Sequence, residues 1–384
     1  FTEYHLSLQQ GILYQPHPAL AKDTNGNYRY HQLTEAETAK IKTLSYLEHT
    51  GTRELVAEDY VYQIKRLANP ALHSPISHLM QEYIVGLKAL HDTLKANPAT
   101  DLRTHTISGV SANSPHELVI RIKGQYPQFI YWLAMPFFAP MPWEADVFYA
   151  QAGLAKNNIN LHWYPIGTGA YMLTENNPNL RMVLEKNPNF REQTYPSDGE
   201  IGDKEKGLLD DAGKKIPFID KAVFTLEKES IPYWNKFLQG YFDSSGISSD
   251  SFDSAVSISG NDDIQLTDDM VDKGIKLNTV VNSSIFYLGF NMLDPIVGGK
   301  SERARLLRQA VSIAVDYEEY ISIFLNGRGI PGQGPIPPGI FGHIDGKEGI
   351  NPYIYDWVDN KPKRKSIAYA KTLLEQANYA QGID

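Results

Sequence analysis

Two short segments with alternating apolar residues, each bounded by turn residues, constrain the fold of this chain more than any other feature. The first follows residues 167–169 (Gly-Thr-Gly) and places Tyr171 and Leu173 on one face. The second covers 183–186 and ends at an Asn-Pro pair. Glycines permit a positive φ or a close approach of the backbone, and Asn-Asn-Pro-Asn at 176–179 is typical of a turn. The pattern therefore predicts two short strands joined by a polar turn.

Composition and charge limit the classes of protein that this chain can belong to. Its 384 residues are enough for two or three domains with complete cores. The net charge of −9, with both signs mixed along the chain, disfavours nucleic acid and anionic membranes as partners. No apolar run reaches 18 residues, so no membrane-spanning helix is predicted. Cysteine is absent, which excludes disulfides, thiolate metal sites and a Cys nucleophile and mildly favours an oxidising compartment.

Helical and strand periodicities alternate along the chain. Ser301 is the expected cap of a helix that begins at Glu302, and Asp316 with Glu319 forms the capping box of the next helix. The expected helices are 52–67, 76–96, 231–240, 302–315, one that opens at 316 and stops at Gly327 and Gly329, and one within 365–379; the expected strands are 117–123, 222–226 and 284–291. The aromatic-rich segment 126–164 is either a ligand wall or an ordinary core, and the core is favoured because aromatic residues dominate core burial.

Catalytic and metal-binding patterns are missing from the sequence. No two histidines stand at i, i+2 or i, i+4, and there is no Gly-x-Ser-x-Gly elbow. Residues 167–169 lack the third glycine of a dinucleotide loop. The segment 243–247 begins like a calcium loop, but Ile247 stands where an oxygen ligand is needed. We therefore expect a binding protein, not an enzyme, with no metal and no cofactor.

Segments in a fixed order, from about residue 52 to residue 339, carry a resemblance to one family. The chain resembles the peptide/nickel-type extracellular solute-binding proteins of ABC importers, the oligopeptide/dipeptide-binding protein family. Besides the Gly-Thr-Gly strand and its partner, the segments that match are 53–67 (Arg-Glu-Leu-Val-Ala-Glu-Asp-Tyr-Val-Tyr…Leu), 237–243 (Phe-Leu-Gln-Gly-Tyr-Phe-Asp), 290–318 (Phe-Asn-Met…Arg-Gln-Ala…Asp-Tyr-Glu) and 327–339 (Gly…Pro-Pro-Gly).

The resemblance implies an α/β fold of the two-lobed periplasmic-binding-protein type (type II, with an extra domain), in which helices flank mixed sheets. Mapped onto this chain, lobe I would comprise 1–22 and 165–284, domain II would comprise 23–164, and lobe III would start at 285–384. Family members begin before Phe1 and continue beyond Asp384, so the sequence is expected to be a fragment that lacks both ends.

The same resemblance implies a function. The protein would be the extracytoplasmic, periplasmic or secreted, binding component of an ABC importer, with its signal peptide outside this chain. It would bind oligopeptides in an interlobe cleft, close about a hinge, and deliver them to the permease subunits in the membrane. A monomer that binds no nucleic acid is expected.

One loop, one strand and two residues near the expected crossover strand are the candidate ligand contacts by resemblance. Tyr287 could stack on or hydrogen-bond a ligand, or it could be a buried tyrosine of the interlobe core. Thr168 and Tyr171 lie near the expected crossover strand, where turn chemistry alone also accounts for them. The full set is Ser244, Ser245, Gly246, Ile247, Phe286, Tyr287, Gly289, Thr168 and Tyr171.

Other functions remain open at the level of sequence. The same fold can serve a receptor-docking, sensor or chaperone-like protein, or bind nickel, haem, a sugar or an opine, although the lack of a His cluster lowers the case for nickel. An enzyme with a site assembled across the lobes is a further class, which a hydrolytic assay would detect. A neighbouring permease and ATPase gene would favour the importer.

Overall fold

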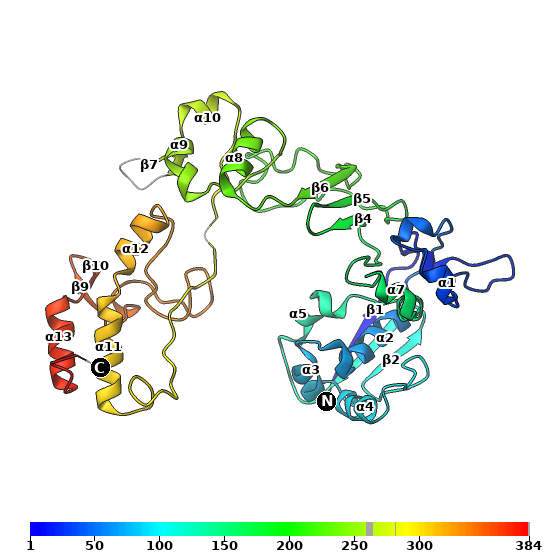
Figure 1. The fold of residues 1–384 in the computed structure, drawn as a ribbon, viewed down its shortest axis with the longest axis horizontal. Coiled ribbons are helices and arrows are strands. Elements are labelled where there is room, and N and C mark those ends of the chain that lie inside the picture. The colour runs from blue at the N-terminus through cyan, green and yellow to red at the C-terminus, as the bar shows by residue number, and fades with distance from the viewer. Residues whose placement is uncertain (259–263, 281, 383–384) are drawn as a thin grey trace. The chain divides into compact units, whose positions relative to one another are not determined.

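The structure is a computed structural model that describes residues 1–258, 264–280 and 282–382, and it comprises two compact units, 1–226 and 227–384 (Figure 1). The parts of the expected lobes at 259–263, 281 and 383–384 lie outside the described residues. The first unit contains β1 (Thr2–Ser7), α1 (Glu35–Thr38), α2 (Ala57–Leu67), α3 (Ser77–Tyr83), α4 (Leu87–Ala96), β2 (Val110–Ser114), β3 (Glu117–Ile122), α5 (Phe129–Leu133), α6 (Trp143–Tyr149), α7 (Ala152–Lys156), β4 (Tyr171–Asn177), β5 (Arg181–Lys186) and β6 (Lys221–Thr225). This mixture of helices and small sheets confirms the α/β class.

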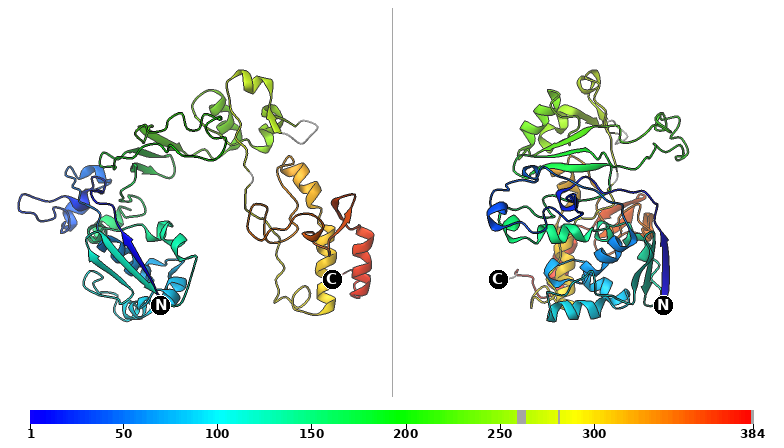
Figure 2. Two further views of the ribbon diagram at one scale, coloured as in Figure 1. Left: turned by 180° about the vertical axis from the view of Figure 1, so that it is seen from behind. Right: turned by 90° about the vertical axis from the view of Figure 1, so that its right-hand side faces the viewer.

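An antiparallel sheet of order β1-β3-β2 forms the base of the first unit. Its central strand alternates as predicted, with Leu118, Ile120 and Ile122 buried on one face. Helix α2 packs on this sheet (Figure 2), which removes its apolar stripe from water. The strand predicted at 117–123 is therefore confirmed.

Tertiary pairing shortens or divides two of the predicted helices. Helix α2 begins at Ala57 and not near residue 52, because Leu55 donates its backbone N–H to Ile12 and the preceding residue bridges to Leu13. The predicted helix 76–96 is divided into α3 and α4. Between them, the backbone N–H of Val85 donates to the carbonyl of Arg121, and Gly86 has a φ of 82°, which glycine adopts without steric cost.

The strand pair predicted around the Gly-Thr-Gly run is present as β4 and β5, which pair antiparallel from Tyr171–Lys186 to Asn177–Arg181. Strand β6 adds to the other side of β5. The expectation that the two glycines serve a special backbone geometry is wrong. Neither Gly167 nor Gly169 has a positive φ, and a Cβ atom at either position would find room.

The aromatic-rich segment forms part of the core of the first unit. Phe129, Phe138, Phe148 and Tyr149 are buried together with the apolar faces of α2, α4 and β3. The favoured interpretation of this segment as ordinary core is therefore confirmed.

The second unit contains α8 (Ser230–Leu238), α9 (Phe252–Ala255), β7 (Val256–Ile258), β8 (Ile264–Leu266), α10 (Asp268–Asp272), α11 (Glu302–Ala314), α12 (Tyr317–Phe324), β9 (Tyr355–Val358), β10 (Lys361–Arg364) and α13 (Ile367–Gln376). Its described residues form two small cores. One lies between α11 and α13, and the other surrounds Trp234 and Phe252. None of the helices in the described residues is both long and apolar enough to cross a membrane.

The predicted N-caps of the second unit are present, although of the capping box expected at 316–319 the described bonds include only the one accepted by Asp316. The Ser301 hydroxyl accepts the N–H of Ala304 at 3.2 Å, and the Asp316 carboxylate accepts the N–H of Glu319 at 2.9 Å. These caps satisfy backbone donors that a helix start leaves free.

The strand predicted at 284–291 is not formed. Most of its apolar residues, including Phe286 and Leu288, are exposed, and the segment has no paired strand among the described residues. A β-strand needs a neighbour to satisfy its backbone hydrogen bonds, and the described segments supply none here. The apolar pattern indicates that a segment is suited to strand pairing, but it does not indicate whether a partner strand is present.

Replacement of a buried isoleucine in the first unit should reduce stability much more than replacement of an exposed one. Ile120→Ala should destabilise the unit by about 2–5 kcal/mol, because Ile120 is fully buried on the central strand. The matched change Ile130→Ala, at an exposed position of α5, should cost less than about 1 kcal/mol. Chemical denaturation followed by circular dichroism measures both, and equal losses would contradict this description of the core.

Candidate functional site

The Gly-Thr-Gly turn of the first unit is held from one side by Gln15. The Gln15 backbone N–H donates to the carbonyl of Gly167 at 2.9 Å, and its side-chain oxygen accepts the N–H of the same glycine at 3.1 Å. Its side-chain nitrogen donates to the carbonyl of Pro165 at 3.3 Å. Gln15 is buried, so these bonds replace water that the amide would otherwise bind.

Asn187 holds the same turn from the end of β5. Its side-chain nitrogen donates to the carbonyl of Gly169 at 2.9 Å, and its backbone N–H donates to the carbonyl of Ala170 at 2.9 Å. The Asn187 side-chain oxygen accepts the N–H of Asn189 at 3.0 Å, and Asn189 in turn donates to the carbonyl of Tyr14. Asn187, the asparagine of the Asn-Pro pair noted in the sequence, thus holds the turn in place.

A buried chain of hydrogen bonds runs from His17 through Tyr149 to Tyr164, just before the turn. His17 accepts the N–H of Ala19 at its Nδ1, so the proton of the neutral ring lies on Nε2 and points to the Tyr149 hydroxyl at 2.9 Å. That hydroxyl donates to the carbonyl of Tyr164 at 2.6 Å. Burial lowers the pKa of His17 to about 3 and raises the pKa of Tyr149.

Thr168 and Tyr171, the two candidate ligand residues of the first unit, lie in and just after this turn. Both are partly buried. The Tyr171 hydroxyl donates to the carbonyl of Ile219 at 2.8 Å, and this bond ties the start of β4 to the segment before β6. The hydroxyl therefore has a structural partner within the unit.

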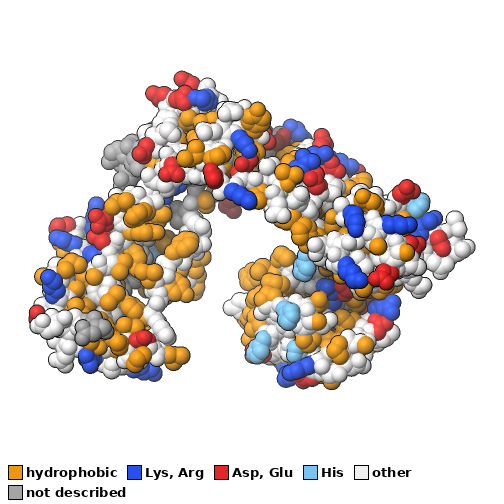
Figure 3. All heavy atoms as spheres, viewed as in Figure 1, with side chains coloured by type: hydrophobic (Ala, Val, Ile, Leu, Met, Phe, Trp, Pro, Cys, Tyr) orange, Lys and Arg blue, Asp and Glu red, His pale blue; other side chains and the backbone are white. Residues whose placement is uncertain are grey.

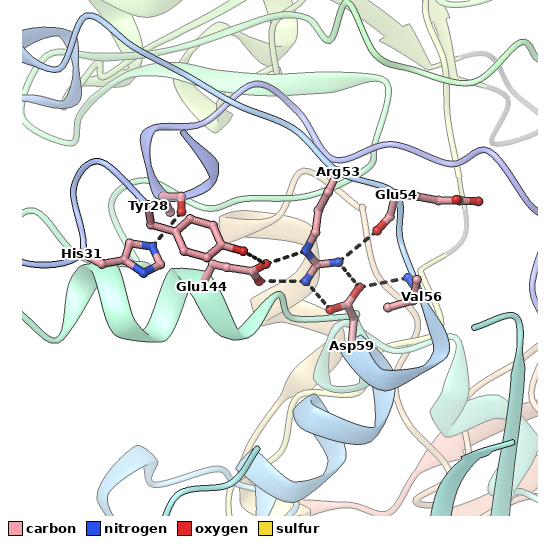
Figure 4. Close-up of polar contacts among 8 residues, drawn as sticks. Tyr28, His31, Arg53, Glu54, Val56, Asp59 and Glu144 are labelled. Atoms are coloured by element: carbon pink, nitrogen blue, oxygen red, sulfur yellow. Dashed lines mark hydrogen bonds and ion pairs between the residues drawn. The ribbon is translucent and has the colours of Figure 1, made fainter. Parts of the chain in front are cut away.

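The most extensive polar cluster of the first unit surrounds Arg53 (Figure 4). Its guanidinium donates to both oxygens of Asp59 at 2.6 and 2.9 Å and to both oxygens of Glu144 at 2.7 and 2.8 Å. A further bond to the backbone carbonyl of Glu54 occupies the fifth N–H donor. Both carboxylates are buried, so neither can rely on water for its charge.

The partners of Arg53 are themselves fixed to the backbone and to a tyrosine. Asp59 accepts the N–H of Val56 at 3.0 Å and so completes the start of α2. Glu144, on α6, accepts the hydroxyl of Tyr28 at 2.9 Å. Burial opposes the charge of Glu144, but the bonds and charge of Arg53 outweigh it and hold the pKa of Glu144 below its usual value. Chemically, this is a clamp between segments and has no open ligand position.

The candidate loop of the second unit, Ser244 to Ile247, is attached to other residues at both of its ends and has one bond within it. The Tyr233 hydroxyl donates to the Ser244 carbonyl at 3.1 Å, and the Ser245 hydroxyl donates to the carbonyl of Gly246 at 2.9 Å. The Ile247 side chain packs on the core around Trp234. Only part of the loop, Ser244 and Gly246 in particular, is open to solvent.

The remaining candidates, Phe286, Tyr287 and Gly289, lie on the extended exposed segment of the second unit. Phe286 is 94 % and Tyr287 is 81 % exposed. Apolar side chains also cover much of the visible surface of this unit, including the face over α12 (Figure 3). In the described part of the chain no hydrogen bond joins this segment to residues 244–247.

Two shallow surface depressions contain none of the candidate residues. One, of about 200 Å³, borders α11 and is lined by residues that include Phe290 and Arg308. The other, of about 380 Å³, borders α7 in the first unit and is lined by residues that include His31 and Gln151. Among the residues that the structure describes, no group of three or more His, Asp or Glu side chains could hold a metal ion.

Sequence reasoning missed the residues that hold the turn and the clamp. Gln15 lies in a segment without periodicity, and Glu144 is 91 positions from its partner Arg53. Only Asn187 carried a usable signal, since Asn-Pro at a strand end often closes a turn.

Loss of the Glu144 charge should weaken the first unit. Glu144→Gln replaces one of the two buried carboxylates of Arg53 with a neutral amide. It should lower the free energy of unfolding by about 2 kcal/mol. Glu302→Gln, which removes an exposed pair with Arg305, should cost less than about 1 kcal/mol. Urea unfolding of the two variants distinguishes them, and an unchanged midpoint for Glu144→Gln would contradict the clamp.

His17 should make the stability of the first unit fall in acid. Its pKa is about 3 in the folded chain and 6.5 in the reference state, so the unfolded chain takes up the proton first. This group's contribution is complete above about pH 6.5 and is lost towards pH 3, with a slope of about 1.4 kcal/mol per pH unit. His17→Asn retains a cap for Ala19 but cannot titrate, so its unfolding free energy should vary less between about pH 7 and 5. Identical slopes for the two proteins would refute the assignment.

Comparison with known families matches most of this chain. Residues 49–384 match the family described as "Bacterial extracellular solute-binding proteins, family 5 Middle". The periplasmic oligopeptide-binding protein OppA of Salmonella typhimurium is 31 % identical over 137 residues, which cover 35 % of this chain and 23 % of that protein.

Solved structures share the fold at low sequence identity. The Helicobacter pylori periplasmic binding protein DppA in complex with the peptide STSA has a TM-score of 0.51 at 18 % identity, covering 99 % of this chain and 55 % of that one. Burkholderia pseudomallei OppA has a TM-score of 0.52 at 17 % identity, covering 98 % and 56 %. Listeria monocytogenes OppA bound to peptide has a TM-score of 0.53 at 15 % identity, covering 100 % and 57 %.

These likenesses confirm the expected periplasmic-binding-protein type of fold. The chain spans about half the length of the solved relatives and about a quarter of the length of the curated one. Since the family match extends over residues 49–384, the chain belongs to the bacterial extracellular solute-binding proteins of family 5.

Proposed function

We propose that this protein is the solute-binding component of an ABC importer and that its solute is a short peptide. The observation that carries the proposal is the family match over residues 49–384. It is supported by the fold shared with the DppA and OppA structures that hold a bound peptide. On this proposal the protein works outside the cytoplasm, as a monomer, and passes its ligand to membrane permease subunits. It performs no catalysis and binds no nucleic acid.

The proposed mechanism is closure of two lobes about a hinge. We assign lobe I to 1–22 and 165–284, domain II to 23–164 and the start of lobe III to 285–384. A ligand that contacts both lobes binds the closed form more tightly than the open form, and this difference drives closure. The permease would then dock on the closed form.

The proposed ligand contacts are the loop Ser244 to Ile247, the segment with Phe286, Tyr287 and Gly289, and the turn with Thr168 and Tyr171. Their chemistry suits a peptide of variable sequence. The extended segment that contains Tyr287 has no strand partner among the described residues, so its backbone can bond to another extended chain. The exposed rings of Phe286 and Tyr287 offer apolar contact that does not depend on one side chain.

Addition of peptides to the purified protein tests the proposal. A pool of synthetic tri- to pentapeptides should raise the melting temperature, because a ligand that binds only the folded state stabilises it by mass action. A pool of free amino acids at equal mass concentration is the control and should have no effect. If peptides give no shift and a single sugar, metal ion or haem does, the proposed solute is wrong.

Removal of the Tyr287 ring should weaken peptide binding without loss of stability. Tyr287→Ala should reduce affinity for the stabilising peptide by about tenfold, in line with the loss of one aromatic contact at a binding surface. Its melting temperature without ligand should be that of the wild type, since the ring is exposed. Tyr46→Ala, at another exposed tyrosine in the first unit, is the control. Equal affinities for the wild type and Tyr287→Ala, by titration calorimetry, would remove Tyr287 from the site.

A further inference from the structure

Arg328 joins the turn after α12 to the segment 247–252 of the second unit. Its Nη1 donates to the carbonyl of Ile247 at 2.9 Å, and its Nη2 donates to the hydroxyl of Ser249 at 3.3 Å. Its Nε donates to the carbonyl of Leu325 at 3.0 Å. One guanidinium therefore bonds to two segments that are about eighty residues apart in sequence.

The end of α12 is shaped to present these groups. Asn326 and Gly327 have φ of 51° and 74°, which turns the chain back after the helix, and the Gly327 N–H bonds to the carbonyl of Ile321 at 3.0 Å. The carbonyl of Phe324, left free by the helix end, accepts the hydroxyl of Ser249 at 3.2 Å. Ser249 thus bonds to both the helix end and Arg328.

The guanidinium also lies on a fixed aromatic ring. Its central carbon is 4.9 Å from the centre of the Phe252 ring, and Phe252 is buried in the core that surrounds Trp234. Ile247, whose carbonyl Arg328 binds, packs on the same core. The contact therefore connects the turn after α12 to a packed body, not to a free loop.

We infer that Arg328 is a positioning residue for the proposed peptide site. It holds the loop Ser244 to Ile247 against the end of α12. The inference rests on the proposed function, in which the loop belongs to lobe I and α12 to the start of lobe III. Under that assignment Arg328 is an interlobe latch that limits how the loop is presented to the ligand.

Arginine suits this role and lysine does not. The rigid guanidinium provides separate N–H groups for two carbonyls and a hydroxyl while its flat face rests on Phe252. A lysine ammonium can keep the charge above the ring but cannot reach all three acceptors in one geometry. Comparison of Arg328→Lys with Arg328→Gln therefore separates the hydrogen-bond fork from the charge.

Hydrogen exchange of the intact protein tests the positioning role without any ligand. Arg328→Gln and Arg328→Lys should each speed amide exchange in residues 244–252 by about tenfold, since both lose the fork that holds the loop. Amides of α11 and α13 should keep the wild-type rates. Arg305→Gln, at another exposed arginine that bonds within its own helix, is the control and should leave 244–252 unchanged. Wild-type exchange rates at 244–252 in both Arg328 variants would overturn the inference.

Peptide titration separates failure of this inference from failure of the proposed function. With a peptide that stabilises the wild type, both Arg328 variants should bind about three- to tenfold more weakly, mainly through faster dissociation. If the wild type binds peptides and the Arg328 variants bind equally well, the latch is wrong and the proposed function stands. If the wild type binds no peptide, the proposed function fails, while the exchange experiment still decides whether Arg328 positions the loop.

Discussion

The bonding of one arginine to two buried carboxylates organises the first unit. Arg53 comes just before α2, Asp59 lies in the first turn of that helix, and Glu144 lies on α6. Because all five donors of Arg53 are used, the extended segment before α2 is fixed to both helices at once. A pair of buried charges is stabilising only when it is fully bonded, so any change in the position of α6 relative to α2 would leave a charge without a partner.

A second set of neutral bonds extends this frame to the Gly-Thr-Gly turn. Gln15, Asn187 and the chain from His17 to the carbonyl of Tyr164 each end at a backbone group in or beside 164–170. The turn is thus fixed by side chains from distant segments, not by an unusual glycine backbone. In a protein that is proposed to close around a ligand, such a turn provides a stable reference from which β4 and its neighbours extend. We then expect greater flexibility in other segments, such as 284–289, whose side chains are exposed and which pair with no strand among the described residues.

Local signals in the sequence predicted those elements whose causes are local. Alternation predicted β3, β4 and β5, and the hydroxyl of Ser301 predicted the start of α11, since each depends on residues close in sequence. The order of several motifs identified the family. In contrast, the start of α2 and the break at Gly86 depend on backbone pairing with Ile12 and Arg121, which no local pattern reveals. The strand predicted at 284–291 failed for the same reason, because a strand is a property of a pair.

The candidate ligand residues show the same limit. The sequence pointed to Tyr287 through family resemblance, and the structure gives it an exposed ring. No pattern in the sequence indicated that Arg328 bonds to the loop that contains Ile247, because the two segments are distant in sequence. The partner of a buried charge, such as Glu144 for Arg53, can be identified only once the fold is known. The residue type alone indicates only that a buried charge needs a partner.

Native mass spectrometry of the intact protein as purified, with fragmentation of any bound species, tests the central claim most directly. The account predicts a ladder of bound masses that fragment as short peptides, because a site built on backbone pairing and exposed aromatic rings accepts many sequences. A single bound species that does not fragment as a peptide would contradict the claim that peptides are the solute.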